Sequence, residues 1–299
     1  MRVAVTGASG LIGSALVPHL RSAGHEVSRL VRRPASAADE ITWDPATGTV
    51  DLDRLAGTDA VIHLAGAGVG DHRWTDAYKR EILQSRVDGT TTIATAMAAL
   101  DPKPRVLVSA SAIGWYGDTG DRAVDETAPA GTGFLADVVR AWEAAAAPAA
   151  AAGIRVVHPR TGLVVSSKGG AWARMFPLFK AGLGGKLGDG RQYWSWISLR
   201  DEVQALQALM EDDTYSGPVN LTGPTPVTNA EVTTTMGHVL GRPTFLPAPA
   251  FALKLALGEF STEVLGSSRV MPAVLESRGF PFADRTIESA VRSALAESR

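Results

Sequence analysis

Three glycines stand at a spacing that suits binding of a phosphate group. The stretch TGASGLIG has glycine at positions 7, 10 and 13, after the β-branched run RVAVT and before a segment with helical spacing. In that context Gly7 permits a tight turn, Gly10 lets the backbone approach a pyrophosphate, and Gly13 allows close packing of helix on strand. The first N–H groups of the helix and their partial positive charge attract the phosphates. The pattern predicts a dinucleotide site with contacts from Gly7, Ser9, Gly10, Leu11, Ile12 and Gly13.

Two arginines follow the second predicted strand, in the run RLVRRP. A fold that binds NAD usually has Asp or Glu near this point, about 20 residues after the loop, where it binds the ribose 2′-hydroxyl. A guanidinium group instead suits a 2′-phosphate, in both charge and geometry. We therefore predict NADP(H) as the cofactor, with contacts from Arg32 and Arg33. The alternative for either residue is a solvated surface charge.

A further ligand-binding residue is predicted at the end of a later strand. Arg160 closes the run IRVVHPR, on the side where open α/β sheets bind their ligands. A guanidinium group there suits the phosphate or carboxylate of a substrate. The alternative is an ion pair within the domain.

The elements that position these residues alternate between strand and helix. The strands are short runs that are apolar almost throughout, as expected of strands buried on both faces of a sheet. Alternation at this spacing implies right-handed crossovers and a doubly wound parallel sheet, the Rossmann arrangement of the α/β class. A helix over 75–100 is expected to be interrupted near Gly89. The predicted strands cover 2–6, 25–32, 59–66, 104–111 and 154–160.

The character of the sequence changes after residue 165. Residues 1–165 are expected to form the Rossmann domain, to which residues 200–225 return. Residues 166–199 and 226–299 are expected to form a smaller, mostly helical C-terminal region on the substrate side.

Composition restricts the class of protein. The 299 residues carry a net charge of −2, with 45% hydrophobic and 20% charged residues, so a large core forms and no broad nucleic-acid footprint is expected. There is no cysteine, and the six histidines lack the spacing of zinc ligands, so no metal site is predicted. No apolar run approaches the roughly 18 residues of a membrane span. We expect a cytoplasmic protein whose partner is a small-molecule substrate.

Several motifs together resemble a known family. VTGASGLIG, DAVIHLAG and VLVSAS followed by YG resemble the extended short-chain dehydrogenase/reductase superfamily, of the NAD-dependent epimerase/dehydratase type. RWTDAYKREILQSRVDGT, SAIGWYG, FLADVVRAWEAAA and GLGGKLGDGRQYWSWISLRDEV resemble its "epimerase family protein" branch, and the likeness covers nearly the whole chain. Members of this branch are atypical reductases with a small C-terminal domain of unknown function, and some are labelled as cell-division inhibitors.

The resemblance implies roles for particular residues. The HLAG segment would lie along the cofactor, and Ser109 would end the next strand beside it. Ser111 matches the catalytic serine of the superfamily, and Tyr116 matches the tyrosine of its YG signature with one extra residue between them. Near the loop GLGGKLGDG, a substrate pocket would include Gln192 and Trp196, although a strand tryptophan more often serves packing. The HLAG residues are His63, Leu64, Ala65 and Gly66.

The proton-handling pair of the superfamily, Tyr and Lys four residues apart on a helix, is absent. The four tyrosines are followed at that distance by Ile, Gly, Ile and Val. The helix predicted over 134–146 has apolar residues at 134, 135, 138 and 139, where the pair would stand. Its charged residues Asp137, Arg140 and Glu143 are expected elsewhere on the surface.

Two functions follow from this departure. The first is an NADP(H)-dependent oxidoreductase or epimerase-like enzyme that acts on a small substrate through Ser111 and Tyr116. Tyr116 and Lys79 are candidates to replace the missing acid. For Tyr116 the alternative is a tyrosine of the core or the pocket wall, and for Lys79 an exposed lysine paired with an acidic residue. The second function is an NADP(H)-binding sensor or regulatory protein with little or no catalysis.

Overall fold

The computed structural model describes residues 1–297, and a nine-stranded sheet lies at its centre. The strands of this sheet are β1 (Arg2–Thr6), β2 (Glu26–Val31), β3 (Glu40–Asp44), β4 (Thr49–Val50), β5 (Ala60–His63), β6 (Val106–Ser109), β7 (Ser111–Ala112), β9 (Arg155–Thr161) and β13 (Gly217–Leu221). Their spatial order is β13-β9-β6-β5-β1-β2-β3-β4, and β7 pairs with β9. Every pairing is parallel except that of β3 with β4. The predicted doubly wound parallel sheet is confirmed.

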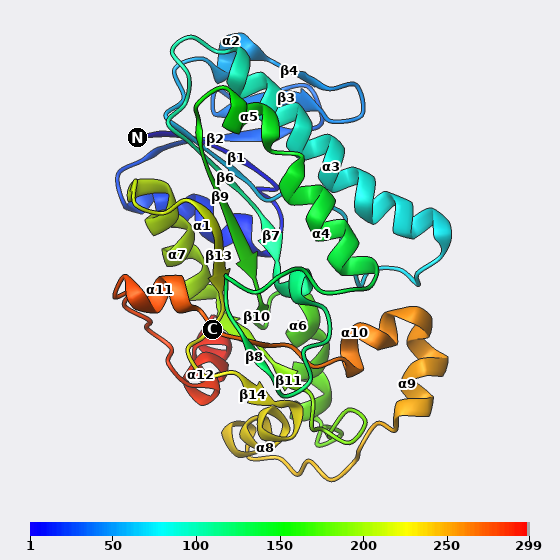
Figure 1. Ribbon diagram of the computed structural model, residues 1–299. Helices are drawn as coiled ribbons and strands as arrows, with labels where there is room; N and C mark the ends of the chain where they lie inside the picture. Colours follow the sequence, from blue (N-terminus) through cyan, green and yellow to red (C-terminus); the bar gives the residue numbers. More distant parts are fainter. Residues whose placement is uncertain (298–299) are drawn as a thin grey trace.

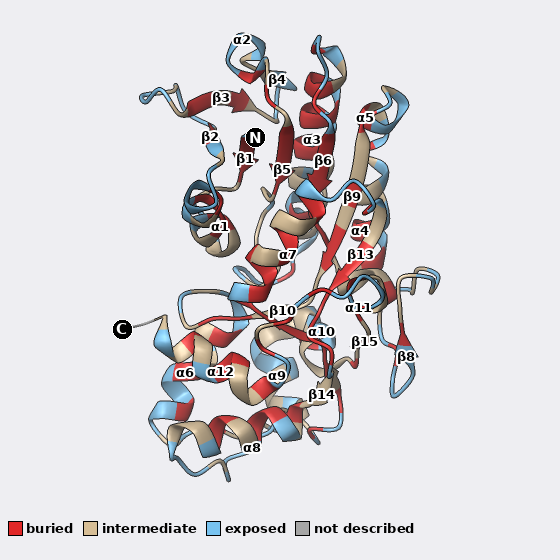
Figure 2. Ribbon diagram, turned by 90° about the vertical axis from the view of Figure 1, so that its left-hand side faces the viewer, coloured by how far each residue is buried: buried red, intermediate tan, exposed pale blue. Residues whose placement is uncertain are grey.

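Helices cover both faces of the sheet (Figure 1). On one face lie α1 (Leu11–Ser22) and α7 (Leu199–Glu211), and on the other lie α3 (Asp76–Ala99), α4 (Phe134–Ala144) and α5 (Ala147–Ala151). The short α2 (Leu52–Leu55) follows β4. The central strands are the most deeply buried part of the molecule (Figure 2), as their apolar sequences require.

The expected interruption of α3 at Gly89 is wrong, because the helix continues through this residue. A Cβ atom at Gly89 would lie 3.3 Å from Cε1 of His63. The glycine therefore lets the helix pack closely against the end of β5. Its low helix propensity is outweighed by this tertiary packing.

A smaller region lies beyond the carboxyl ends of the strands (Figure 1). Its own core contains Trp172, Phe176, Trp194 and Trp196. Its helices are α6 (Gly170–Lys180), α8 (Asn229–Leu240), α9 (Ala250–Leu257), α10 (Ser261–Leu265), α11 (Ala273–Ser277) and α12 (Ile287–Ala296), with 3-10 turns η1 (Ile113–Tyr116) and η2 (Gly258–Phe260) nearby. Short strand pairs complete it: β10 (Leu163–Val165) with β12 (Trp196–Ser198), β11 (Tyr193–Trp194) with β14 (Val227–Thr228), and β8 (Ala123–Val124) with β15 (Arg269–Val270).

The chain crosses between the two regions several times. After β12, α7 packs against α1 and β13 pairs with β9, so this segment belongs to the central sheet. The carboxylate of Asp201 then accepts backbone hydrogen bonds from Ala283 at 2.8 Å and Asp284 at 3.0 Å, which attach the C-terminal segment to α7. Among residues 1–297, no helix has the length and apolar character needed to cross a membrane.

Candidate active site

The glycine loop joins β1 to α1 at the carboxyl edge of the sheet. Gly7 has φ of +63°, and a Cβ atom there would lie 2.8 Å from the carbonyl carbon of Leu64. A Cβ atom at Gly13 would overlap the carbonyl oxygen of Gly7. Both positions therefore require glycine, and the loop lies directly on the segment after β5. Helix α1 starts after Gly10 with no side chain capping its first N–H groups, so they are open to an anion.

The two arginines after β2 differ in their surroundings. Arg33 donates to both carboxylate oxygens of Glu40, at 2.8 and 2.6 Å, and these bonds help lower the pKa of Glu40 to about 2. Arg32 is exposed, and its guanidinium has no hydrogen bond or ion pair within residues 1–297. Arg32 is therefore free to bind a ligand, whereas Arg33 would first have to leave or share Glu40.

The residues after β5 and β6 lie at different depths. Leu64, Ala65 and Gly66 form an accessible segment beside the glycine loop. His63 is fully buried, and its Nδ1 lies 2.8 Å from Oγ1 of Thr6. Burial lowers the pKa of His63 to about 4, so its imidazole is neutral at physiological pH. Ser109 is also fully buried, and its hydroxyl has no partner in the described chain.

A chain of buried polar groups connects η1, α4, β9 and β13. The hydroxyl of Ser111 donates to Oε1 of Glu143 at 2.6 Å, and Arg160 donates to both oxygens of the same carboxylate at 2.8 and 3.0 Å. Arg160 also donates to the phenol oxygen of Tyr116 at 3.0 Å. The phenol in turn donates to Oδ1 of Asn220 at 2.8 Å. The structure therefore brings Ser111, Tyr116 and Arg160 into one network.

This network corrects one expectation, that for Glu143, and shows the surroundings of Arg160 and Tyr116. Glu143 was expected on the surface, but its side chain is only 12% exposed because it pairs with Arg160. Arg160 makes the internal ion pair that was the alternative to substrate binding, and its guanidinium also stacks 3.9 Å from the ring centroid of Trp115. Tyr116 is 3% exposed, and burial raises its pKa despite the neighbouring Arg160 charge. A tyrosine that transfers protons near neutral pH needs a lowered pKa.

Gln192 and Trp196 serve the packing of the loop that was expected to border a pocket. Trp196 is fully buried and donates from its indole to the carbonyl of Thr225 at 3.0 Å. Gln192 is 6% exposed and donates to the carbonyl of Leu187 at 3.0 Å. Both side chains therefore hold backbone segments together in the region below the sheet.

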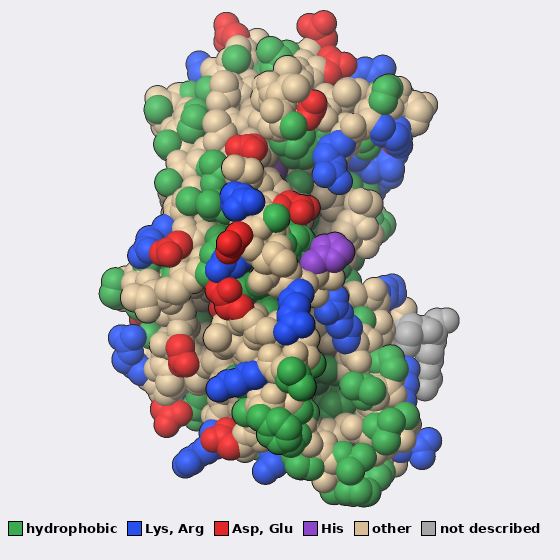
Figure 3. Space-filling model, turned by 90° about the vertical axis from the view of Figure 1, so that its right-hand side faces the viewer, with side chains coloured by type: hydrophobic (Ala, Val, Ile, Leu, Met, Phe, Trp, Pro, Cys, Tyr) green, Lys and Arg blue, Asp and Glu red, His purple; other side chains and the backbone are tan. Residues whose placement is uncertain are grey.

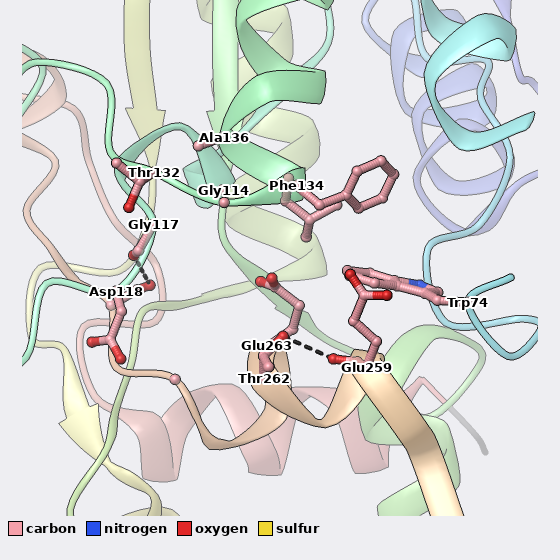
Figure 4. Close-up of a pocket in the computed structure, with 14 residues that line it drawn as sticks. Trp74, Gly114, Gly117, Asp118, Thr132, Phe134, Ala136, Glu259, Thr262 and Glu263 are labelled. Carbon is pink, nitrogen blue, oxygen red and sulfur yellow. Dashed lines mark hydrogen bonds between the residues drawn. The ribbon is translucent and has the colours of Figure 1, made fainter. Parts of the chain in front are cut away.

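The apolar side of α4 forms a wall of a cavity of about 340 Å³ (Figure 4). Phe134 and Leu135 line it from above, and α10 lines it from below. In the close-up, the carboxyl group of Glu263 points from α10 into the cavity toward the start of α4, on the Gly114 side, and Glu259 lies beside Trp74, below the ring of Phe134. The walls and the charge of Asp118 raise the pKa of Glu263, with desolvation as the larger cause, although the carboxyl keeps access to solvent in the cavity.

Whichever residue of α4 corresponds to the tyrosine of the superfamily, Phe134 or Leu135, it lines this cavity. The cavity therefore lies against the part of α4 where the resemblance places the tyrosine of the superfamily. Lys79, considered above as a replacement acid, instead binds Glu259 at 2.9 Å, as its paired alternative predicted.

Three features of the site were missed in the sequence. Glu143 follows Leu135 and Val139 at steps of four, so it shares their inward-facing row, and this spacing could have revealed it. Asn220 and Glu263 lie more than 70 residues from α4 in the sequence, and no local pattern connects them with it.

Proteins of similar sequence and structure share this architecture. A model of the NAD dependent epimerase/dehydratase family matches residues 3–221, and one of a domain of unknown function (DUF1731) matches residues 248–294. Epimerase family protein MT2273 of Mycobacterium tuberculosis is 49% identical over 290 residues, which cover 97% of this chain and 96% of that protein. A crystal structure of human epimerase family protein SDR39U1 (isoform 2) with NADPH is 30% identical, with a TM-score of 0.90 over 99% of each chain. A crystal structure of the nucleoside-diphosphate sugar epimerase from Corynebacterium glutamicum is 36% identical, with a TM-score of 0.83 over 99% of this chain and 58% of that one. This chain belongs to the NAD dependent epimerase/dehydratase family.

Proposed function

We propose that this protein is an NADP(H)-dependent enzyme of the oxidoreductase or epimerase type that acts on a small molecule without a Tyr/Lys pair. The observation that carries the proposal is the cavity in front of α4, which a protein that only binds a cofactor would not need. Pockets of this size, with apolar walls and a few polar groups, are typical of small-molecule sites.

The cofactor site is proposed from the glycine loop and the arginine beside it. The uncapped start of α1 would bind the pyrophosphate, and Arg32 would bind the 2′-phosphate of NADP(H). The relative crystallised with NADPH supports this choice of cofactor. Leu64, Ala65 and Gly66 would pass along the cofactor, and His63 and Ser109 would support this segment from beneath. When bound, the nicotinamide supplies or accepts hydride.

Ser111 and Tyr116 are proposed to have different roles. Because the Ser111 hydroxyl donates its proton to Glu143, the lone pairs of its oxygen remain to accept a hydrogen bond from a substrate hydroxyl. Tyr116 donates to Asn220 and accepts from Arg160, so it would position Ser111 and η1 without transferring a proton. Arg160 would keep Glu143 in place, and Gln192 and Trp196 would stabilise the region below the site.

A sensor remains the second candidate, and one observation favours it. The phenol of Tyr116 and the guanidinium of Arg160 are turned into the core and bonded to each other, away from solvent. A protein that only reports the redox state of NADP(H) could keep such a network for rigidity.

The proposal is tested by measuring the oxidation of NADPH by the protein in the presence of each member of a panel of aldehydes and ketones. For an enzyme, at least one compound should be reduced, and Ser111→Ala should lower kcat/KM by about tenfold or more while the Kd for NADPH stays unchanged. Glu276→Gln, at an exposed position on α11, is the matched control and should leave both values unchanged. NADPH binding without turnover of any compound in the panel would refute the oxidoreductase type and leave the sensor or the epimerase type, because an epimerase returns the hydride to its substrate and consumes no NADPH.

A further inference from the structure

The cavity in front of α4 has an unusual distribution of charge. Its ionisable lining residues are Asp118, Glu259 and Glu263, and no Lys, Arg or His is among its lining residues. Lysine and arginine lie beside acidic side chains across the middle of this side of the molecule (Figure 3), so the charge on this face is mixed. The excess of carboxylates therefore belongs to the cavity.

An ammonium group of the protein itself already sits at the edge of the cavity. Nζ of Lys79 lies 2.9 and 3.1 Å from the two oxygens of Glu259 and 5.2 Å from the ring centroid of Phe134. A carboxylate and an aromatic face together are the surroundings that a protonated amine prefers. This position shows, within the structure, the chemistry by which the wall of the cavity holds a cation.

Carboxylates and aromatic rings also line the rest of the cavity, where the described protein supplies no positively charged group. The carboxylate of Glu263 has no hydrogen bond or ion pair within the described chain, and it points into the cavity toward the start of α4 (Figure 4). Asp118 accepts backbone hydrogen bonds from Gly120 and Ser267 but has no positively charged partner. Trp74 packs edge-on against Phe134 at 4.9 Å between centroids, which completes an aromatic wall.

We infer that this cavity binds a ligand with a protonated amine next to a ring or other apolar group, and that it rejects nucleoside diphosphate sugars. The amine would lie between Glu263 and the aromatic wall, and the apolar part would lie against Phe134 and Leu135. A diphosphate would bring two negative charges next to Asp118 and Glu263, which have no positively charged partner, and the one ammonium nearby, that of Lys79, is already paired with Glu259. The inference rests on the proposed function in one respect, because it takes this cavity to be the substrate site.

Calorimetric titration of the full chain saturated with NADP⁺ tests the inference with probes of one size and three charges. Benzylamine should bind more tightly than benzyl alcohol, and benzoate should bind most weakly. Glu263→Gln should weaken benzylamine about fivefold, the effect of one ion pair open to solvent, and leave benzyl alcohol unchanged. Glu276→Gln, an exposed glutamate of α11, should change neither. Uridine diphosphate glucose should show no binding.

The inference is overturned if benzoate or uridine diphosphate glucose binds as tightly as benzylamine, or if Glu263→Gln leaves benzylamine binding intact. As a control, NADP⁺ is titrated into the same protein without any probe. Failure to bind NADP⁺ would refute the proposed function. Binding of NADP⁺ together with equal affinities for the three probes would refute only the proposed class of ligand.

Discussion

The buried carboxyl group of Glu202 should make the stability of this protein fall as the pH rises. Glu202 lies in the first turn of α7 and is fully buried. One oxygen accepts a hydrogen bond from Thr161 at 2.9 Å, and the other has no partner among the described residues. Because burial penalises the charged form, the pKa of Glu202 rises to about 8 from its ordinary value of 4.5. The folded protein thus keeps this carboxyl protonated at neutral pH.

The sign and size of the effect follow from proton linkage. Between pH 4.5 and about 8 the unfolded chain has released this proton and the folded protein still holds it, so the free energy of unfolding decreases with pH. The slope is about 1.4 kcal/mol per pH unit, and over the interval of about 3.5 units the loss reaches about 5 kcal/mol. Above the folded-state pKa both states are ionised, and the loss stops growing.

Glu202→Gln removes this titration while it keeps an oxygen for Thr161. Urea unfolding of the wild type and the variant at pH 5, 7 and 9 measures the difference in unfolding free energy, and contributions from all other groups cancel in that difference. The variant should gain on the wild type by about 3 to 5 kcal/mol from pH 5 to 9. Glu276→Gln should show no such gain. Parallel curves for wild type and Glu202→Gln would refute the assignment of a neutral carboxyl at this position.

Two further predictions concern the site. Glu143→Gln should lower the free energy of unfolding, measured in urea, by about 3 to 5 kcal/mol, because it leaves the buried Arg160 guanidinium without a counter-charge. The double variant with Arg160→Met should recover part of this loss. If the effects of the two substitutions are fully additive, the pairing is contradicted. Arg32→Ala should weaken NADPH by about 10- to 100-fold and NADH much less in fluorescence titration, with exposed Arg242→Ala as the matched control; equal losses for both cofactors would argue against the 2′-phosphate contact.

The fold was predictable because its signals are local. Strands such as VLVS are apolar up to their last residue, and this is the pattern of a parallel sheet buried on both faces. The glycine loop could be recognised because two of its glycines meet local requirements of the βα turn: Gly7 has a positive φ, and a Cβ atom at Gly13 would overlap the carbonyl oxygen of Gly7. These signals depend on neighbours within about ten residues, so no tertiary knowledge is needed to read them.

The site was predictable only in part because its contacts are distant in sequence. Arg160 was expected near a ligand, and the sequence could not show that Glu143 would reach it from another element. The same holds for Arg33, whose partner Glu40 stands on the next strand. A charged residue at the end of a parallel strand can pair either with a ligand or with an oppositely charged residue of the protein. Which of the two it pairs with depends on the tertiary packing.

Within the proposed function, the apolar side of α4 and the acidic residues of segment 258–265 are related, because both line the same cavity. A lysine on α4 at Val138 or Val139 would lie within the buried packing of the helix, where both residues are at most 3% exposed. Without it, no fixed cation belongs to the lining of the cavity, and Glu259 neutralises the one ammonium at its edge. The carboxylates of Glu263 on α10 and of Asp118, which have no positively charged partner, then set the charge of the cavity. On this reasoning, substitutions in residues 258–265 should change which ligands bind, whereas substitutions on α4 should mainly change how the wall of the cavity packs.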